Sequence, residues 1–75
     1  MGWYFMRNAQ EIAILIKAEL KSRKITAAKM LSDTGLSPDV LANMQKGSMP
    51  SADKLGKIAQ YLDISTDYLL GLVDG

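Results

Sequence analysis

The stretch that decides the fold runs from Ile25 to Gly47 and reads ITAAKMLSDTGLSPDVLANMQKG. Near its start, Thr26 is a residue type that caps helix N-termini, because its hydroxyl accepts from free backbone N–H groups. A helical pattern follows over residues 27–33. Gly35 comes next and can adopt the left-handed conformation that ends many helices. The first part of the stretch therefore predicts a short capped helix that ends in a glycine turn.

The second part of the stretch predicts another short helix. Ser37 is a suitable cap, and Pro38 occupies the first helical position, where a missing N–H costs nothing. Asp39 adds negative charge to the first turn, where the helix dipole favours it. Gly47 stops the helix after Lys46. The expected buried anchors of the two helices are Met30, Leu31, Leu41 and Met44.

Helical periodicity also precedes this stretch. A first helix is expected over residues 8–22, with one apolar stripe formed by Ile12, Leu15, Ile16 and Leu20. Ala13, Ile14 and Ala18 lie off that stripe. This helix therefore has more apolar surface than one core face requires.

Two further helices are expected after the stretch. Ser51 and Ser65 are their caps, and the last helix runs from Thr66 to about Leu70 and ends at Gly71. The expected buried residues of the fourth helix are Leu55, Ile58, Ala59 and Leu62. Several helices joined by short links form a compact bundle. The predicted fold class is therefore all-α, a compact five-helix bundle.

The length of the chain fits this bundle. Its 75 residues leave room for one domain, which we divide into an apolar N-terminal arm (1–7), a five-helix core (8–71) and a tail (72–75). A chain this short buries only about 60% of the surface that its unfolded form exposes. Compact helical packing or a partner subunit must supply the remaining stability.

The composition argues against several kinds of site. The chain has no cysteine and no histidine, so it lacks the usual zinc ligands and the commonest general base. It has no phosphate-binding loop and its carboxylates are scattered, so we expect no enzyme, no cofactor, no metal and no small-molecule substrate. Its apolar stretches fall far short of the ~18 residues of a membrane span. We therefore expect no membrane association and a cytoplasmic location.

Charge is unevenly distributed along the chain. Residues 1–32 carry six basic side chains against two acidic ones, whereas residues 33–75 carry three basic against six acidic ones. One interpretation is a basic side that faces a polyanion. The other is that the cations at residues 21–24 lie at a helix end, where they favour the dipole.

The stretch Ile25–Gly47 resembles the Cro/cI-like (XRE) family of helix-turn-helix regulators. Residues 54–71, KLGKIAQYLDISTDYLLG, are similar to that family's fourth and fifth helices, and the resemblance covers about residues 8–71. It implies a lambda-repressor-like five-helix fold and sequence-specific binding of duplex DNA by a small transcriptional regulator. The second motif helix, about residues 38–46, would lie in the major groove. If the chain is such a regulator, we expect no sensing domain, and this simplicity resembles phage or mobile-element regulators.

The resemblance also implies which residues contact DNA. In that family the start of the first motif helix touches phosphate, the exposed face of the second reads base edges, and the end of the second and the loop after it touch phosphate again. The DNA-binding residues carried over in this way are Thr26, Ala27, Ser37, Pro38, Asp39, Ala42, Asn43, Lys46 and Ser48. Val40 either touches a thymine methyl or belongs partly to the core.

Side-chain chemistry gives several of these residues a role. The amide of Asn43 can bond adenine N6 and N7 together, and Lys46 and Lys29 are candidates for phosphate contact. Asp39 can accept a hydrogen bond from cytosine N4, although a helix-start role explains it as well. Few cations lie near the recognition helix, so we expect weak binding by a monomer and paired half-sites for a homodimer.

The N-terminal arm is the expected dimer contact. Trp3, Tyr4, Phe5 and Met6 are four consecutive large apolar residues before the first helix. Either this arm folds back onto the first helix, or it docks on a second subunit. We favour the second interpretation, which makes the arm part of a homodimer.

An alternative function is a protein–protein interaction module on the same fold, with little or no DNA binding. The acidic second half and the apolar arm favour it. So does Ala27, which stands where the resembling family often has glutamine. Salt-dependent retention on duplex DNA separates the two functions.

Overall fold

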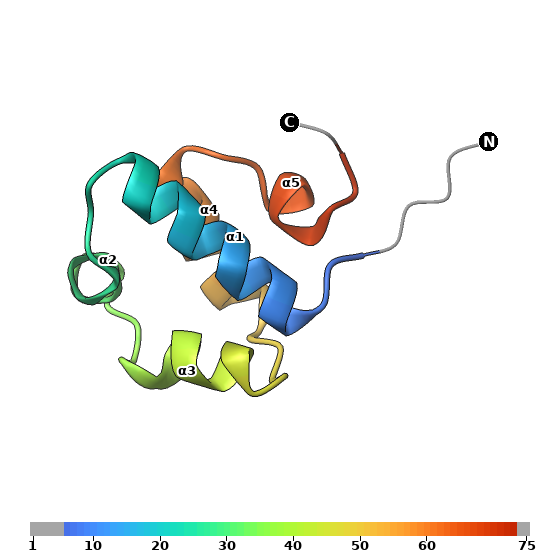
Figure 1. Ribbon diagram of the computed structural model, residues 1–75, viewed down its shortest axis with the longest axis horizontal. Coiled ribbons are helices and arrows are strands. Elements are labelled where there is room, and N and C mark those ends of the chain that lie inside the picture. Colours follow the sequence, from blue (N-terminus) through green and yellow to red (C-terminus); the bar gives the residue numbers. More distant parts are fainter. Residues whose placement is uncertain (1–5, 74–75) are drawn as a thin grey trace.

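The computed structural model describes residues 6–73, and all regular structure in that part of the chain is helical. The five helices are α1 Ala9–Ser22, α2 Ala27–Thr34, α3 Asp39–Gln45, α4 Ala52–Leu62 and α5 Thr66–Leu70. The predicted all-α class and the order of five helices are confirmed. α1 packs against α3 and α5, while α4 packs against α2 and α5, so the helices enclose one core (Figure 1).

Polar side chains cap four of the five helices. Asn8 begins α1 with a capping box, in which its side chain accepts from the Glu11 N–H at 2.8 Å and the Glu11 carboxylate accepts from the Asn8 N–H at 2.9 Å. Thr26, Ser51 and Ser65 cap α2, α4 and α5 as predicted. Short-range signals in the sequence therefore determine where these helices begin.

α3 begins differently from its prediction. Its first residue is Asp39, its N-cap residue is Pro38, and Pro38 makes no side-chain cap. Ser37, the predicted cap, still serves the first turn, because its hydroxyl accepts from the Asp39 N–H at 3.3 Å and its carbonyl accepts from the Val40 N–H at 3.1 Å. The predicted cap is therefore displaced by one residue, a shift that is common at helix ends.

All five helices end in the same hydrogen-bonded turn. Each end has a residue at positive φ, and the next N–H donates to the carbonyl five residues back at 2.9–3.0 Å, as in the Schellman motif. Three of these residues are Gly35, Gly47 and Gly71, as expected from glycine's tolerance of this conformation. Lys24 and Asp63 occupy the other two positions, each with a φ of 57°. These two helix ends therefore carry backbone strain.

The core draws apolar side chains from every helix. Its largest fully buried residues are Ile12, Ile16, Met30, Met44, Ile58, Leu62 and Leu69. The anchors predicted for α2 and α3 are all buried, as are the four predicted for α4. The helical periodicity therefore located most of the core.

The predicted stripe of α1 needs a correction. Leu15, which we placed on the stripe, is only half-buried, whereas Ala13, which we placed off it, is fully buried. The reason is that α1 packs against both α3 and α5, so its buried strip is displaced toward Ala9 and Ala13. Ile14 stays outside the core, with 68% of its surface exposed.

Arg7 ties the residues before α1 to the end of α5. Its guanidinium donates to the carbonyl of Tyr68 and, at 3.4 Å, to that of Leu69, and its backbone N–H donates to the Leu70 carbonyl at 2.8 Å. The guanidinium also lies over the Tyr68 ring, 5.4 Å from the ring centroid. Arg7 therefore satisfies carbonyls that the last turn of a helix leaves free.

Arg23 does the same for the end of α4. It donates to the Leu62 carbonyl at 2.7 Å and pairs with Glu19. Arg7 and Arg23 are two of the six cations of the basic first half. Both are engaged within the fold, so the interpretation of that half as a side facing a polyanion does not hold for them.

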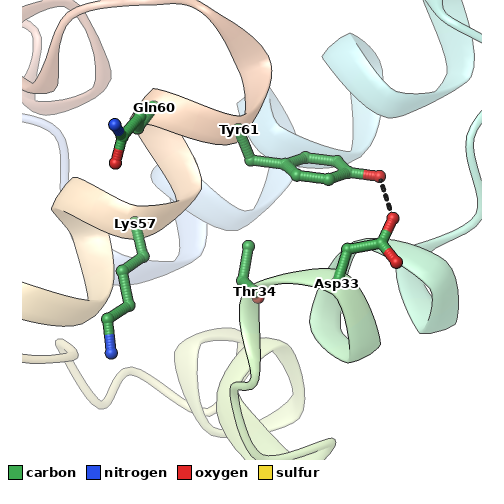
Figure 2. Close-up of a pocket in the computed structure, with 5 residues that line it drawn as sticks. All are labelled: Asp33, Thr34, Lys57, Gln60 and Tyr61. Carbon is green, nitrogen blue, oxygen red and sulfur yellow. Dashed lines mark hydrogen bonds between the residues drawn. The ribbon is translucent and has the colours of Figure 1, made fainter.

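A side-chain hydrogen bond joins α2 to α4 (Figure 2). The Tyr61 hydroxyl donates to the Asp33 carboxylate at 2.8 Å, and Lys29 pairs with the same carboxylate at 3.2 Å. The hydrogen bond from Tyr61 and the contact with Lys29 hold the pKa of Asp33 below its ordinary value. The bond to Asp33 in turn raises the pKa of Tyr61. This contact links α2 to α4 at the surface.

Candidate nucleic-acid interface

α2, the turn at Gly35 and α3 form the two-helix unit predicted from the sequence. Figure 1 views α2 nearly end-on while α3 lies across the picture, so the two helices cross steeply. Gly35 makes the turn with a φ of 71°, and the Leu36 N–H donates to the Leu31 carbonyl at 2.9 Å. The residues that hold the inner face of α3 to the core are Val40, Leu41 and Met44. The opposite face of α3 is left to solvent.

The outer face of α3 is a row of four exposed side chains, which we call the α3 ridge. Its members are Asp39, Ala42, Asn43 and Lys46, at the i, i+3, i+4 and i+7 positions that share one face of a helix. They present a carboxylate, a methyl, an amide and an ammonium group. Val40 is only 5% exposed, so most of its side chain belongs to the core.

A hollow of about 260 Å³ lies beside the ridge. Its walls come from the start of α3, the loop between α3 and α4, and the start of α4. The predicted DNA-binding residues that line it are Ser37, Asp39, Asn43 and Ser48. Lys54 lines it as well, although it is not among the predicted DNA-binding residues. The available signal was its position in the first turn after the Ser51 cap, next to the predicted phosphate-binding loop.

The other predicted residues lie outside this hollow. Pro38, Ala42 and Lys46 are exposed on α3 or at its ends but do not line it. Thr26 and Ala27 lie at the start of α2. The Thr26 hydroxyl is exposed and accepts from a backbone N–H at 3.1 Å, whereas Ala27 is half-buried against the core. The structure therefore gathers part of the predicted site and leaves the start of α2 as a separate element.

Ion pairing decides which cations remain available near the ridge. Lys29 is expected to contact phosphate, yet it already pairs with Asp33. Lys46 and Lys54 take no part in the three ion pairs within residues 6–73. Asp39 adds one negative charge to the same hollow. The surface is therefore mixed in charge rather than uniformly basic.

Two other kinds of site are absent from residues 6–73. No three acidic side chains in that range are grouped so that they could hold a metal ion. None of the helices there has the length and apolar character needed to cross a membrane.

Comparison with protein families identifies the arrangement of α2, turn and α3. A family model described as a helix-turn-helix domain matches residues 13–75, which is most of the chain. The matched span includes the α3 ridge and the hollow beside it. No curated protein and no solved structure shows a significant match.

Proposed function

This chain belongs to the helix-turn-helix domain family, and on that premise we propose that it binds duplex DNA sequence-specifically. It acts as a small cytoplasmic transcriptional regulator of the Cro/cI-like (XRE) type, with α3 in the major groove. The observation that supports this most is the α3 ridge, four adjacent exposed side chains on a helix whose other face is buried. A major groove about 12 Å wide admits such a helix.

In this proposal the side chains of the ridge read bases. The Asn43 amide bonds adenine N6 and N7 together, an arrangement that discriminates between bases by about 1–3 kcal/mol. Ala42 offers its methyl to that of thymine, and Asp39 accepts from cytosine N4. The three groups differ in chemistry, so each selects a different base edge.

The residues around the ridge hold the DNA backbone. Lys46, Ser48 and Lys54 contact phosphates on one side of the groove, and Thr26 contacts phosphate at the start of α2. Such contacts set the position of the helix but carry no sequence information. Ser37 lines the hollow beside the ridge, between the start of α3 and the loop after it.

Binding measured as a function of salt tests this proposal. Retention on duplex DNA should fall steeply as the salt concentration rises. Lys46→Gln and Lys54→Gln should each reduce the slope of log binding constant against log salt concentration by about 0.9. Lys57→Gln is the matched control, because Lys57 lies on α4, pairs with Asp53 and is outside the ridge and the hollow. DNA binding through α3 is contradicted if retention does not depend on the salt concentration. It is also contradicted if Lys57→Gln changes retention as much as Lys46→Gln does.

A protein–protein interaction module is the second candidate function. Asp39 favours it, because an exposed carboxylate in the hollow repels phosphate. Ala27 also supplies no polar side chain at the start of α2. Such a module leaves duplex DNA unbound even at low salt, and that outcome of the same titration would favour it.

We further propose that the DNA-binding form is a homodimer that reads half-sites about one helical turn apart. Trp3, Tyr4 and Phe5 of the expected dimer contact lie outside the described residues. Met6, the fourth residue of that contact, is 56% exposed. Sedimentation of the full chain should give the mass of two chains, and a Trp3→Ser, Met6→Ser variant should give the mass of one. A single-chain mass for the unaltered protein at all concentrations contradicts the dimer.

A further inference from the structure

The outer face of α1 carries an apolar side chain that the fold does not use. Ile14 is 68% exposed, and Ala18, one turn further on, is exposed as well. A single exposed apolar residue is ordinary on a protein surface. Its meaning depends on the charges that surround it.

Ile14 is followed by lysines on the same side of the helix. Lys17 and Lys21 lie three and seven residues after it on the helix, and Lys24 follows just beyond the helix end. All three lysines are exposed, and none takes part in the ion pairs within residues 6–73. We call the surface formed by Ile14, Lys17, Ala18 and Lys21 the α1 face.

The acidic residues of α1 are engaged elsewhere. Glu11 completes the capping box at the start of the helix. Glu19 pairs with Arg23, which also donates to the end of α4. The α1 face therefore presents an apolar centre with positive charge along its C-terminal half.

The α1 face and the α3 ridge lie on different helices. α1 and α3 pack against each other, and the residues of the α1 face and of the ridge are exposed. Figure 1 shows α1 crossing the middle of the molecule and α3 along one edge.

We propose that the α1 face docks an acidic amphipathic helix of a partner protein. The partner's carboxylates complement Lys17 and Lys21, and its apolar residues cover Ile14. DNA is a poorer fit, because phosphates offer no apolar surface to Ile14. The chain's own residues 1–5 are a poorer fit as well, because they carry no acidic side chain to complement the lysines. The surface gives the protein a second binding function, separate from the one on α3.

A nuclear magnetic resonance titration of the isotope-labelled full chain tests this proposal. The probe is a synthetic helical peptide with glutamates on both sides of a leucine stripe, and its control is the same peptide with glutamine at every glutamate. We expect the acidic peptide to shift the amide signals of residues 14–21. Ile14→Gln, and Lys17→Glu combined with Lys21→Glu, should each weaken binding at least about fivefold. Met49→Gln, at an exposed apolar residue outside α1, should leave the affinity unchanged.

Each outcome of this titration either supports or overturns the proposal. Shifts confined to the α1 face and lost in the α1 variants support the proposal, provided that those variants keep their amide dispersion, as expected at exposed positions. Absence of binding, equal binding of the glutamine peptide, or shifts elsewhere overturn it. It is also overturned if duplex DNA shifts the same signals, or if the Ile14 methyl groups contact the aromatic rings of residues 3–5 in the free protein.

Discussion

The two faces of α3 make different contributions, although the helix has only seven residues. Leu41 and Met44 face inward and are buried, whereas Asn43 and Lys46 face outward and are exposed. A change of side-chain volume on the inner face disturbs the packing of the surrounding core, because the core is close-packed. The outer face makes no contact on which the core depends. Substitutions at neighbouring positions of α3 should therefore separate the stability of the fold from the proposed DNA binding.

The largest effect is expected at Met44, on the inner face. Met44→Ala removes a fully buried side chain and leaves a cavity, so it should lower the free energy of unfolding by about 2–5 kcal/mol. Denaturant unfolding measures this loss. A loss below about 1 kcal/mol would show that the inner face of α3 is not a rigid part of the core.

The next effect is expected at Asn43, on the outer face. Asn43→Ala should change the free energy of unfolding by no more than about 0.5 kcal/mol, because the side chain is exposed. It should reduce discrimination at one A·T base pair by about 1–3 kcal/mol. Competition between the preferred duplex and single-base variants measures that discrimination. If Asn43→Ala weakens binding to all duplexes equally, Asn43 does not read a base.

A more stable parent protein would make it easier to compare substitutions on the inner and outer faces of α3. Lys24 has a φ of 57°, a conformation that strains an L side chain, so Lys24→Gly should raise the free energy of unfolding by about 0.5–1 kcal/mol. The matched control is Lys21→Gly, inside α1, which should lower it by about 1 kcal/mol. Thermal or denaturant unfolding distinguishes the two. Destabilisation by Lys24→Gly would mean that the lysine side chain contributes more than the strain removes.

The smallest effect is expected away from α3, at the bond between Tyr61 and Asp33. The pKa of Asp33 is lowered in the folded state, so its contribution to stability is present above its ordinary pKa of 3.8 and is lost as pH falls through the folded value. The pKa of Tyr61 is raised, so its contribution is present below its ordinary pKa of 10.0 and is lost as pH rises through the folded value.

Unfolding of the unaltered chain and of Tyr61→Phe should therefore differ at neutral pH and converge at both the acid and the alkaline ends. DNA binding should be the same for both, because the bond lies outside the ridge and the hollow. A stability difference that stays constant across pH would rule out this hydrogen bond as its source.

The parts of the fold that were predictable depend on residues close together in the chain. Thr26, Ser51 and Ser65 bond N–H groups three residues ahead, so the sequence alone locates these helix starts. The turn at Gly35 was predictable in the same way, because it involves only residues close to Gly35 in the sequence. The α3 ridge was predictable for the same reason, since one helical face is a matter of spacing.

The parts that were missed depend on residues far apart in the chain. Arg7 donates a hydrogen bond to the carbonyl of Tyr68, which is 61 residues away in the sequence. Arg23 donates one to the carbonyl of Leu62, which is 39 residues away. No local pattern indicates such contacts. Ala13 was misplaced because its burial depends on how α1 packs against both α3 and α5. Lys54 was missed because its closeness to the loop after α3 in the sequence does not by itself show that the start of α4 lies beside α3.

The position of α3 in the major groove can be tested at a single atom of the DNA. An adenine analogue in which carbon replaces N7 keeps base pairing but removes an acceptor that only the major groove exposes. At one adenine in each half-site, the analogue should weaken binding of the unaltered chain about fivefold and have no further effect on Asn43→Ala. Equal weakening of both proteins, or no adenine at which the unaltered chain responds, would contradict the proposed readout.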